Sequence, residues 1–223
     1  LSSLANLAAI TIEKFNLYKE KLAQQKLNLE LEDAQKVQQL LLPRSMPKTA
    51  RFDFSAKYAL ANRVGGDYYD FLDIDGISKT TAAIAVGDVV GHGIAAAMLM
   101  ATARGILRSR CRTPGTPADL LTHLNALLVE DTWGDRFMTM LLMTVDAKRK
   151  EMCWATAGHD TPIVYDPATD HFSEFNGTGM SLGLVKGAEY EDHLFTDAEE
   201  LDFDLELRMH VIRKTPTTDH ECD

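Results

Sequence analysis

Residues 86–93 have the sequence Val86-Gly87-Asp88-Val89-Val90-Gly91-His92-Gly93, and they follow a nearly continuous apolar run that begins at Thr81. The length and composition of that run, Thr81–Val86, predict a strand that is buried on both faces. An Ala- and Met-rich stretch, Ile94–Leu107, follows and predicts a helix. This order places the Asp88 carboxylate at a strand end, beside the N–H groups of a glycine loop and a helix N-terminus. Such a position suits binding of a metal ion together with an anion.

A second aspartate follows two glycines in the segment Val64-Gly65-Gly66-Asp67-Tyr68-Tyr69-Asp70, which lies between two strand-like runs. The glycines permit a turn with positive φ, from which Asp67 would project. Gly-Gly-Asp is also an ordinary turn sequence, so the segment alone does not define a site. If Asp67 and Asp88 lie close together, their charges repel unless a divalent cation lies between them.

Other catalytic motifs are missing from the sequence. His92, and His159 in Ala157-Gly158-His159-Asp160, lack the spacing of a zinc site, and each also fits a loop imidazole that hydrogen-bonds nearby backbone groups. There is no P-loop sequence and no Gly-x-Ser-x-Gly motif. Cys111 and Cys153 lie at a helix end and within a strand-like run, which does not support a thiol nucleophile. The remaining pattern, aspartates with glycines, indicates water activated by a metal.

Charge and composition exclude several functional classes. The 223 residues have a net charge of -10, and residues 51–223 carry the excess of carboxylates. Such an acidic body would repel a phosphate backbone, so no nucleic-acid partner is expected. No run of about 18 apolar residues is present, so no membrane insertion is expected, and residues 1–20 do not resemble a signal peptide. Three widely spaced cysteines fit a reduced, cytoplasmic setting.

The first 42 residues contain neither Gly nor Pro and predict one long helix, ended by Pro43 and Pro47. Its apolar residues recur every three or four positions, but the step from Leu22 to Leu27 is five residues, so the stripe changes phase there. One interpretation is a helix packed on its own domain. The other, which a helix of this length without a cap favours, is a linker or coiled coil that forms a homodimer.

The remaining chain predicts an α+β domain, because two consecutive helices are followed by many short strands. After the helix Ile94–Leu107, Thr116 and Pro117 begin another helix that runs to about Glu130. The predicted strands are residues 52–61, 81–86, 137–145, 152–157, 162–165, 172–175, 190–195 and 207–212.

Several motifs occur in an order that resembles the SpoIIE/RsbU-type branch of the metal-dependent PPM protein serine/threonine phosphatases. They are Val64–Asp70, Val86–Gly93 with the helix behind it, Leu124-Asn125, Phe137-Met138-Thr139, Ala157-Gly158-His159 and Ser181-Leu182-Gly183. The resemblance covers residues 37–195, and Gln39–Pro43 with Pro47 is similar to the segment that precedes this domain. Residues 1–20 also resemble the last helix of a GAF sensor domain.

The resemblance implies a helical linker at 1–42 and a phosphatase domain at 43–223. The domain would be an αββα sandwich of two antiparallel sheets flanked by helices, with a binuclear Mn²⁺ or Mg²⁺ centre. Asp67 and Asp88 would be the catalytic metal ligands, Asp88 bridging, and the Val89 carbonyl would complete the site. Substrates in this branch are phosphorylated STAS-domain anti-sigma-factor antagonists, whose phosphoserine or phosphothreonine is hydrolysed without a phosphoenzyme.

The sequence departs from the family pattern near Leu201, where a block of the family's helices and acidic motifs is missing. Asp202-Phe203-Asp204-Leu205-Glu206 follows at once and resembles the family's final strand, so Asp204 would be the last metal ligand. Either a mobile block is missing from the sequence, or part of the metal site has been lost. The second alternative would make the protein a pseudophosphatase, a binding module without hydrolysis.

Overall fold

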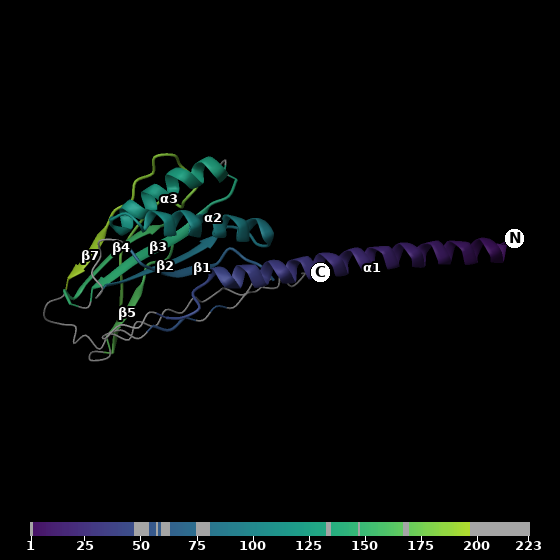
Figure 1. Ribbon diagram of the computed structural model, residues 1–223, viewed down its shortest axis with the longest axis horizontal. Helices are drawn as coiled ribbons and strands as arrows, with labels where there is room; N and C mark the ends of the chain where they lie inside the picture. The colour runs from purple at the N-terminus through teal and green to yellow at the C-terminus, as the bar shows by residue number, and fades with distance from the viewer. Residues whose placement is uncertain are drawn as a thin grey trace, which may run out of the picture.

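A computed structural model describes residues 2–46, 54–56, 58, 63–74, 81–132, 135–146, 148–166 and 170–196 (Figure 1). Three predictions lie outside these residues: Asp204, the strand 207–212, and the missing block near 201–202. Most of the predicted strand 52–61 is also outside them.

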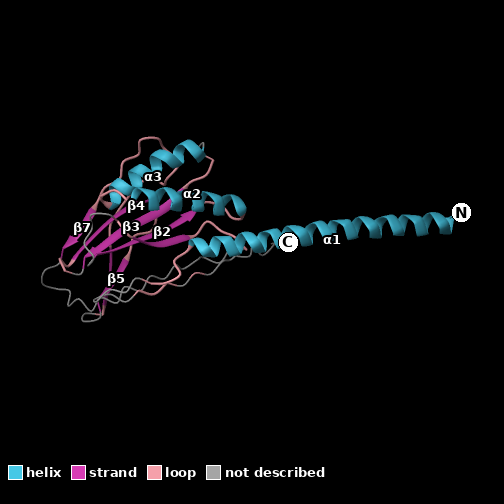
Figure 2. Cartoon of the chain, in the orientation of Figure 1, coloured by secondary structure: helices cyan, strands magenta, loops and turns pink. Residues whose placement is uncertain are grey.

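The described chain is an α+β domain, as predicted, with one long helix in front of it. A five-stranded antiparallel sheet has the strand order β1-β2-β3-β4-β7, and a β5–β6 hairpin forms a second, two-stranded sheet (Figure 2). The elements are α1 Ser2–Leu41, β1 Tyr68–Leu72, β2 Thr81–Val89, α2 Ile94–Arg110, α3 Pro117–Thr132, β3 Met138–Asp146, β4 Glu151–Ala157, β5 Ile163–Asp166, β6 His171–Glu174 and β7 His193–Thr196.

One face of the large sheet packs against α2 and α3. The side chains that fill this layer alternate along each strand, as on any pleated sheet with a buried face. On α2 they recur every three or four residues, at Ala96, Met100, Ala103 and Leu107, all fully buried. The sheet contributes Tyr68, Ala83, Ala85, Val89, Met138, Met140, Leu142, Ala155 and Ala157.

The opposite face of the sheet carries a second apolar layer, made of the alternate residues of the same strands. Its buried members are Ile84, Val86, Leu141, Met143, Val145, Met152, Trp154 and Phe175. Phe175 follows β6 and stacks on Trp154, with 4.4 Å between ring centroids. The sheet is therefore buried on both faces in its middle, which explains the nearly continuous apolar run at 81–86.

Only the last third of α1 packs on the domain. Gln38 and Leu42 are buried and Leu31 is half-buried, whereas the helix before Asn28 projects away from the sheet (Figure 1). The projecting part exposes Leu7, Ile10, Ile12, Phe15, Leu17, Tyr18, Leu22 and Leu27.

Within the part of the chain that the structure describes, no helix has the length and apolar composition needed to cross a membrane.

Several element boundaries differ from the predictions. The strand predicted at 190–195 is β7, which begins only at His193. Residues Tyr68–Leu72 form a strand, whereas the segment up to Asp70 was predicted as a turn between strands. The two glycines do mark a bend, but the pairing with β2 begins immediately after it. β2 continues to Val89, so Asp88 lies inside the strand and not in the loop behind it. α2 is also longer and ends at Arg110.

Candidate active site

Asp67 and Asp88 face each other across two neighbouring antiparallel strands. The β1–β2 register pairs Tyr68 with Gly87, so the next pair along the ladder is Asp67 with Asp88. The backbone continues that pairing, because the Val89 N–H donates to the Gly66 carbonyl at 3.4 Å. Side chains directly opposite each other in such a ladder share a face, with Cβ atoms about 5 Å apart. Extension of the register therefore places the two aspartates that the sequence singled out at opposite backbone positions.

The alternation of side chains decides which face carries the pair. Ile84 and Val86 on β2 belong to the apolar layer away from α2 and α3, so Asp88 lies on that same face. On β3, Thr139 pairs with Asp88 and alternates with Leu141 of the same layer. Asp67, Asp88 and Thr139 thus form a polar row at the end of the sheet, where the apolar layer stops. Asp67 is buried, with 8% of its surface exposed, and Asp88 is exposed.

Gly66 is required by the close approach of β2. A Cβ added at Gly66 would lie 2.7 Å from both the Cβ and the carbonyl oxygen of Val89, a distance that real contacts do not reach. The glycine therefore lets the segment before β1 lie directly against the Val89 carbonyl, the group expected to complete the metal site. The Val89 side chain points the other way, into the layer under the helices.

The donors at this position fit a hard cation. Two carboxylates and a backbone carbonyl form an all-oxygen set, which Mg²⁺ and Mn²⁺ prefer over nitrogen and sulfur. Facing carboxylates also repel each other, and a bound cation would remove that repulsion. Among the described residues, no three His, Cys, Asp or Glu side chains come together to hold a metal ion. The third carboxylate expected, Asp204, lies outside them.

Thr139 on β3 and His159, two residues after β4, extend the polar row. The Thr139 hydroxyl lies 2.8 Å from Nδ1 of His159 and 3.4 Å from the Asp88 carbonyl oxygen. Thr156 on β4 fixes the His159 backbone, donating to its carbonyl at 2.8 Å and accepting from its N–H at 3.1 Å. Burial lowers the pKa of His159 from its ordinary value of 6.5, and the Asp160 charge opposes this shift. Both residues were quoted in motifs, but their contact depends on the β3–β4 pairing and could not be derived locally.

The motifs Leu124-Asn125 and Ser181-Leu182-Gly183 contact each other and the start of β3. Asn125 on α3 donates to the Val185 carbonyl and accepts from the Gly183 N–H, each at 2.9 Å. Leu182 exchanges two backbone hydrogen bonds with Met138, at the start of β3. Leu124-Asn125 and Ser181-Leu182-Gly183 therefore anchor one loop against the sheet end. His92 is exposed in the loop between β2 and α2.

The model of the family "Stage II sporulation protein E (SpoIIE)" matches residues 78–200, more than half of the 223 residues. The chain belongs to the SpoIIE family. The matched range contains Asp88, Thr139 and His159, whereas Asp67 lies ahead of it. The expected family is thus confirmed, and no comparison addresses the suggested GAF helix.

Curated relatives of this SpoIIE-family chain include two phosphoserine phosphatases of Bacillus subtilis (strain 168). RsbU is 29% identical over 168 residues, which cover 75% of this chain and 49% of RsbU. RsbP is 23% identical over 176 residues, covering 77% of this chain and 42% of RsbP. The chain thus spans half or less of the length of these relatives.

Solved structures place the fold in the same class. The SiaA-PP2C domain of Pseudomonas aeruginosa has a TM-score of 0.60 at 20% identity, covering 78% of this chain and 68% of that domain. The chain is thus a member of the SpoIIE family, and its fold is similar to that of a PP2C domain.

Proposed function

We propose that this chain hydrolyses phosphoserine or phosphothreonine on a partner protein in a metal-dependent reaction. The observation that carries the proposal is the position of Asp67, directly before β1, opposite Asp88 near the end of β2. The names of RsbU and RsbP, both phosphoserine phosphatases, support the same reaction.

Each residue of the polar row has a separate task in this mechanism. Asp67 and Asp88 would hold a binuclear Mn²⁺ or Mg²⁺ centre, with the Val89 carbonyl and Asp204 as further donors. When bound, the metal would lower the pKa of water and offset the charge of the phosphoryl group. Thr139 fixes the Asp88 backbone from the next strand, and His159 orients the Thr139 hydroxyl. Gly66 has no side chain, so the segment that carries Asp67 can lie close to the Val89 carbonyl.

The resemblance of the motif series supports a phosphorylated STAS-domain anti-sigma-factor antagonist as the substrate. A net charge of -10 speaks against nucleic acid as a partner. Cys111 and Cys153 are free thiols, which supports a reducing, cytoplasmic setting. The division into a linker at 1–42 and a phosphatase domain at 43–223 is also part of the proposal. The last residues of this linker contact the domain through the buried Gln38 and Leu42.

The decisive test is a Mn²⁺ titration of phosphate release from phosphorylated STAS-domain proteins, with Asp88→Asn as the variant. Loss of one carboxylate charge weakens cation binding, so we expect a loss of at least about 100-fold in kcat/KM. Asp73→Asn is the matched control, because Asp73 is exposed just after β1 and away from the pair. Full turnover by Asp88→Asn, or in excess chelator, would refute the mechanism. A parent chain that binds these proteins without hydrolysis would identify a pseudophosphatase instead.

A further inference from the structure

The segment Gly65–Asp70, which carries Asp67, is held by a different helix on each side of that residue. Gly65, two residues before Asp67, is bound by α1. Asp70, three residues after it, is bound by α2. An extended segment of this length spans about 17 Å, so both attachments lie within about 10 Å of Asp67 along the chain.

The attachment to α1 is a pair of hydrogen bonds between Gln38 and Gly65. The Gln38 Nε2 donates to the Gly65 carbonyl at 2.6 Å, and its Oε1 accepts from the Gly65 N–H at 3.2 Å. Only 4% of Gln38 is exposed, so water cannot replace it without opening the contact. One side chain therefore satisfies both backbone groups of the residue at the bend, and leaving them unpaired would be costly.

Arg63 makes a second contact between the same two segments. Its Nη1 donates to the Asn28 carbonyl at 2.6 Å and pairs with a Glu32 carboxylate oxygen at 2.8 Å. Arg63 and Gly65 thus contact α1 at Asn28, Glu32 and Gln38.

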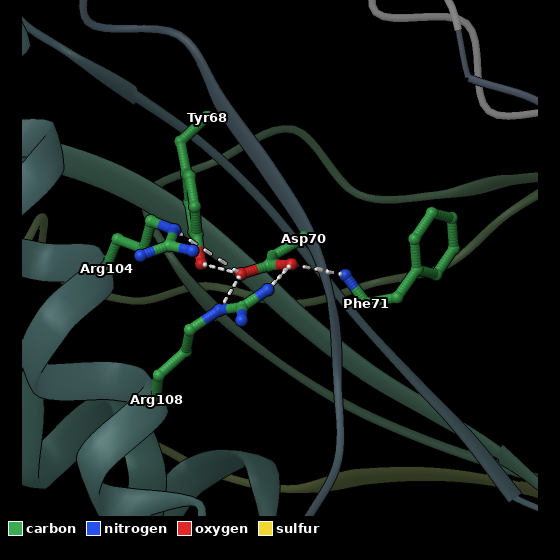
Figure 3. A network of polar contacts seen from close by, with 5 residues as sticks. All are labelled: Tyr68, Asp70, Phe71, Arg104 and Arg108. Atoms are coloured by element: carbon green, nitrogen blue, oxygen red, sulfur yellow. Dashed lines mark hydrogen bonds and ion pairs between the residues drawn. The ribbon is translucent and has the colours of Figure 1, made fainter. Parts of the chain in front are cut away.

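The attachment to α2 is an ionic cluster of Tyr68, Asp70, Arg104 and Arg108 (Figure 3). Asp70 and Tyr68 are buried, whereas the Arg108 side chain is 45% exposed. Arg108 donates through Nε and Nη2 to the two oxygens of Asp70, each at 2.6 Å. Tyr68 donates to Oδ2 and the Phe71 N–H to Oδ1, each at 2.9 Å. The hydrogen bond to Asp70 raises the pKa of Arg108, and burial raises that of Tyr68, so both keep their protons at neutral pH.

Burying a charged group such as Asp70 is not an efficient way to stabilise a fold. Asp70 is completely buried, and the Nε of Arg104, 4.0 Å from Oδ2, has no hydrogen-bond partner among the described residues. Apolar side chains at such positions are often as stabilising as a buried ion pair, or more so. A bidentate guanidinium–carboxylate contact, however, fixes the relative orientation of the two elements that it joins. Apolar packing defines that orientation less precisely.

We propose that Gln38 and the Asp70–Arg108 pair are positioning residues that hold Asp67 opposite Asp88 and so set the metal affinity of the site. The inference rests on the proposed function for the metal itself. It adds that a side chain of α1 and an ion pair on the helix-covered face of the sheet determine the strength of metal binding.

The test measures Mn²⁺ binding to the full chain by electron paramagnetic resonance of free Mn²⁺, with thermal melting in parallel. We expect Gln38→Ala and Asp70→Asn each to raise the Kd for Mn²⁺ about tenfold, the usual cost of losing a residue that orients a ligand. Arg108→Met leaves the buried Asp70 charge without its main partner, so it is expected to be the least stable variant. The double variant Asp70→Asn with Arg108→Met removes both charges. It should recover melting temperature relative to Arg108→Met while its Kd stays raised.

Asp192→Asn is the matched control for general destabilisation. Asp192 accepts a 2.9 Å hydrogen bond from the Ala118 N–H and so holds the start of α3, away from Asp67. This variant should melt earlier and bind Mn²⁺ like the parent. The inference would be overturned if Asp192→Asn weakened Mn²⁺ binding as much as the other variants do. It would also be overturned if Gln38→Ala and Asp70→Asn bound Mn²⁺ like the parent. Neither result would contradict the proposed metal dependence. A parent chain that does not bind Mn²⁺ would overturn both the inference and the proposed metal dependence.

Discussion

At Gly66, a single missing methyl group determines how closely two strands approach. Gly66→Ala would place its Cβ 2.7 Å from Val89, so β1 or β2 must shift. We expect a loss of about 1–3 kcal/mol in stability, as for other overpacked sites, together with weaker Mn²⁺ binding.

Gly105→Ala is the natural comparison for that variant. Gly105 lies within α2, and an added Cβ there meets nothing within 4 Å. Alanine should stabilise the helix by about 0.5–1 kcal/mol, and Mn²⁺ binding should not change. Urea denaturation and Mn²⁺ titration of both variants check the prediction, and a tolerated Gly66→Ala would contradict it.

His159 predicts a pH dependence of stability. Because burial lowers its pKa in the folded state, the unfolded chain takes up a proton first as the pH falls below about 6.5. The contribution of His159 to the free energy of unfolding is therefore fully present above the unfolded pKa. It is lost as the pH falls through the lower pKa of the folded state. His159→Gln should flatten this part of the curve of unfolding free energy against pH, measured by urea denaturation without metal. His123→Gln, at an exposed position on α3, should leave it unchanged. A decline in His159→Gln as steep as in the parent would show that other groups cause it.

Some residues of the site could be predicted from the sequence and others could not. Asp67 and Asp88 were predicted because each combines a carboxylate with a glycine bend next to a strand. Gln38 and Asp70 were not, although Asp70 is part of the quoted motif Val64–Asp70. Their partners, Gly65 and Arg108, are 27 and 38 residues away, and only the packing of α1 and α2 brings them together.

At the level of elements, α1 is helical as predicted, but its apolar stripe is used differently. Leu31 and Ala34 are half-buried against the domain, whereas Leu27 and Val37 of the same predicted stripe are exposed. The polar Gln38 takes the buried position because it serves the Gly65 backbone. The exposed apolar residues before Asn28 form a surface that a second copy of the helix would cover.

Two shortened chains separate the two parts of α1. A chain of residues 28–223 keeps Gln38 and the Arg63 contacts but loses the projecting apolar surface. If that surface forms a homodimer, light scattering should show a dimer for the full chain and a monomer for 28–223, with an unchanged melting temperature. A chain of residues 43–223 also loses Gln38 and Leu42, and it should melt earlier. A dimer that survives in 28–223 would assign the interface to the domain.

The short strand β1 shows why some elements are missed. Its five residues contain two tyrosines and an aspartate, and a Gly-Gly bend precedes them, so local pattern favoured a turn. The pairing with β2, five residue pairs long, outweighs that preference. α2, α3, β3 and β4 were predicted to within a few residues, because their apolar periodicity is long and regular.

At the scale of the whole molecule, completion of the metal site depends on the end of the chain. If Asp204 is the last ligand, Asp204→Ala should weaken Mn²⁺ binding at least about tenfold. Asp202→Ala and Glu206→Ala serve as controls. The three side chains would share one strand face, and only one would reach the depth of the Asp67–Asp88 pair. Exposed carboxylates next to the ligand would each contribute little to Mn²⁺ binding. Isothermal titration of all three variants decides this, and parent-like binding in each would place the ligands elsewhere.

The contact of Arg63 with Asn28 also has a mechanical meaning. α1 has 40 residues and is about 60 Å long, of which about 39 Å lies before Asn28 and about 20 Å behind it. If the helix pivots as a rigid rod at this contact, it is a lever with its fulcrum at Asn28 and Arg63. A sideways displacement of the free end would be reduced about twofold at the Leu41 end, in the opposite direction, while the force would be multiplied by the same factor. The short arm of that lever carries Gln38, which holds the residue two positions before Asp67.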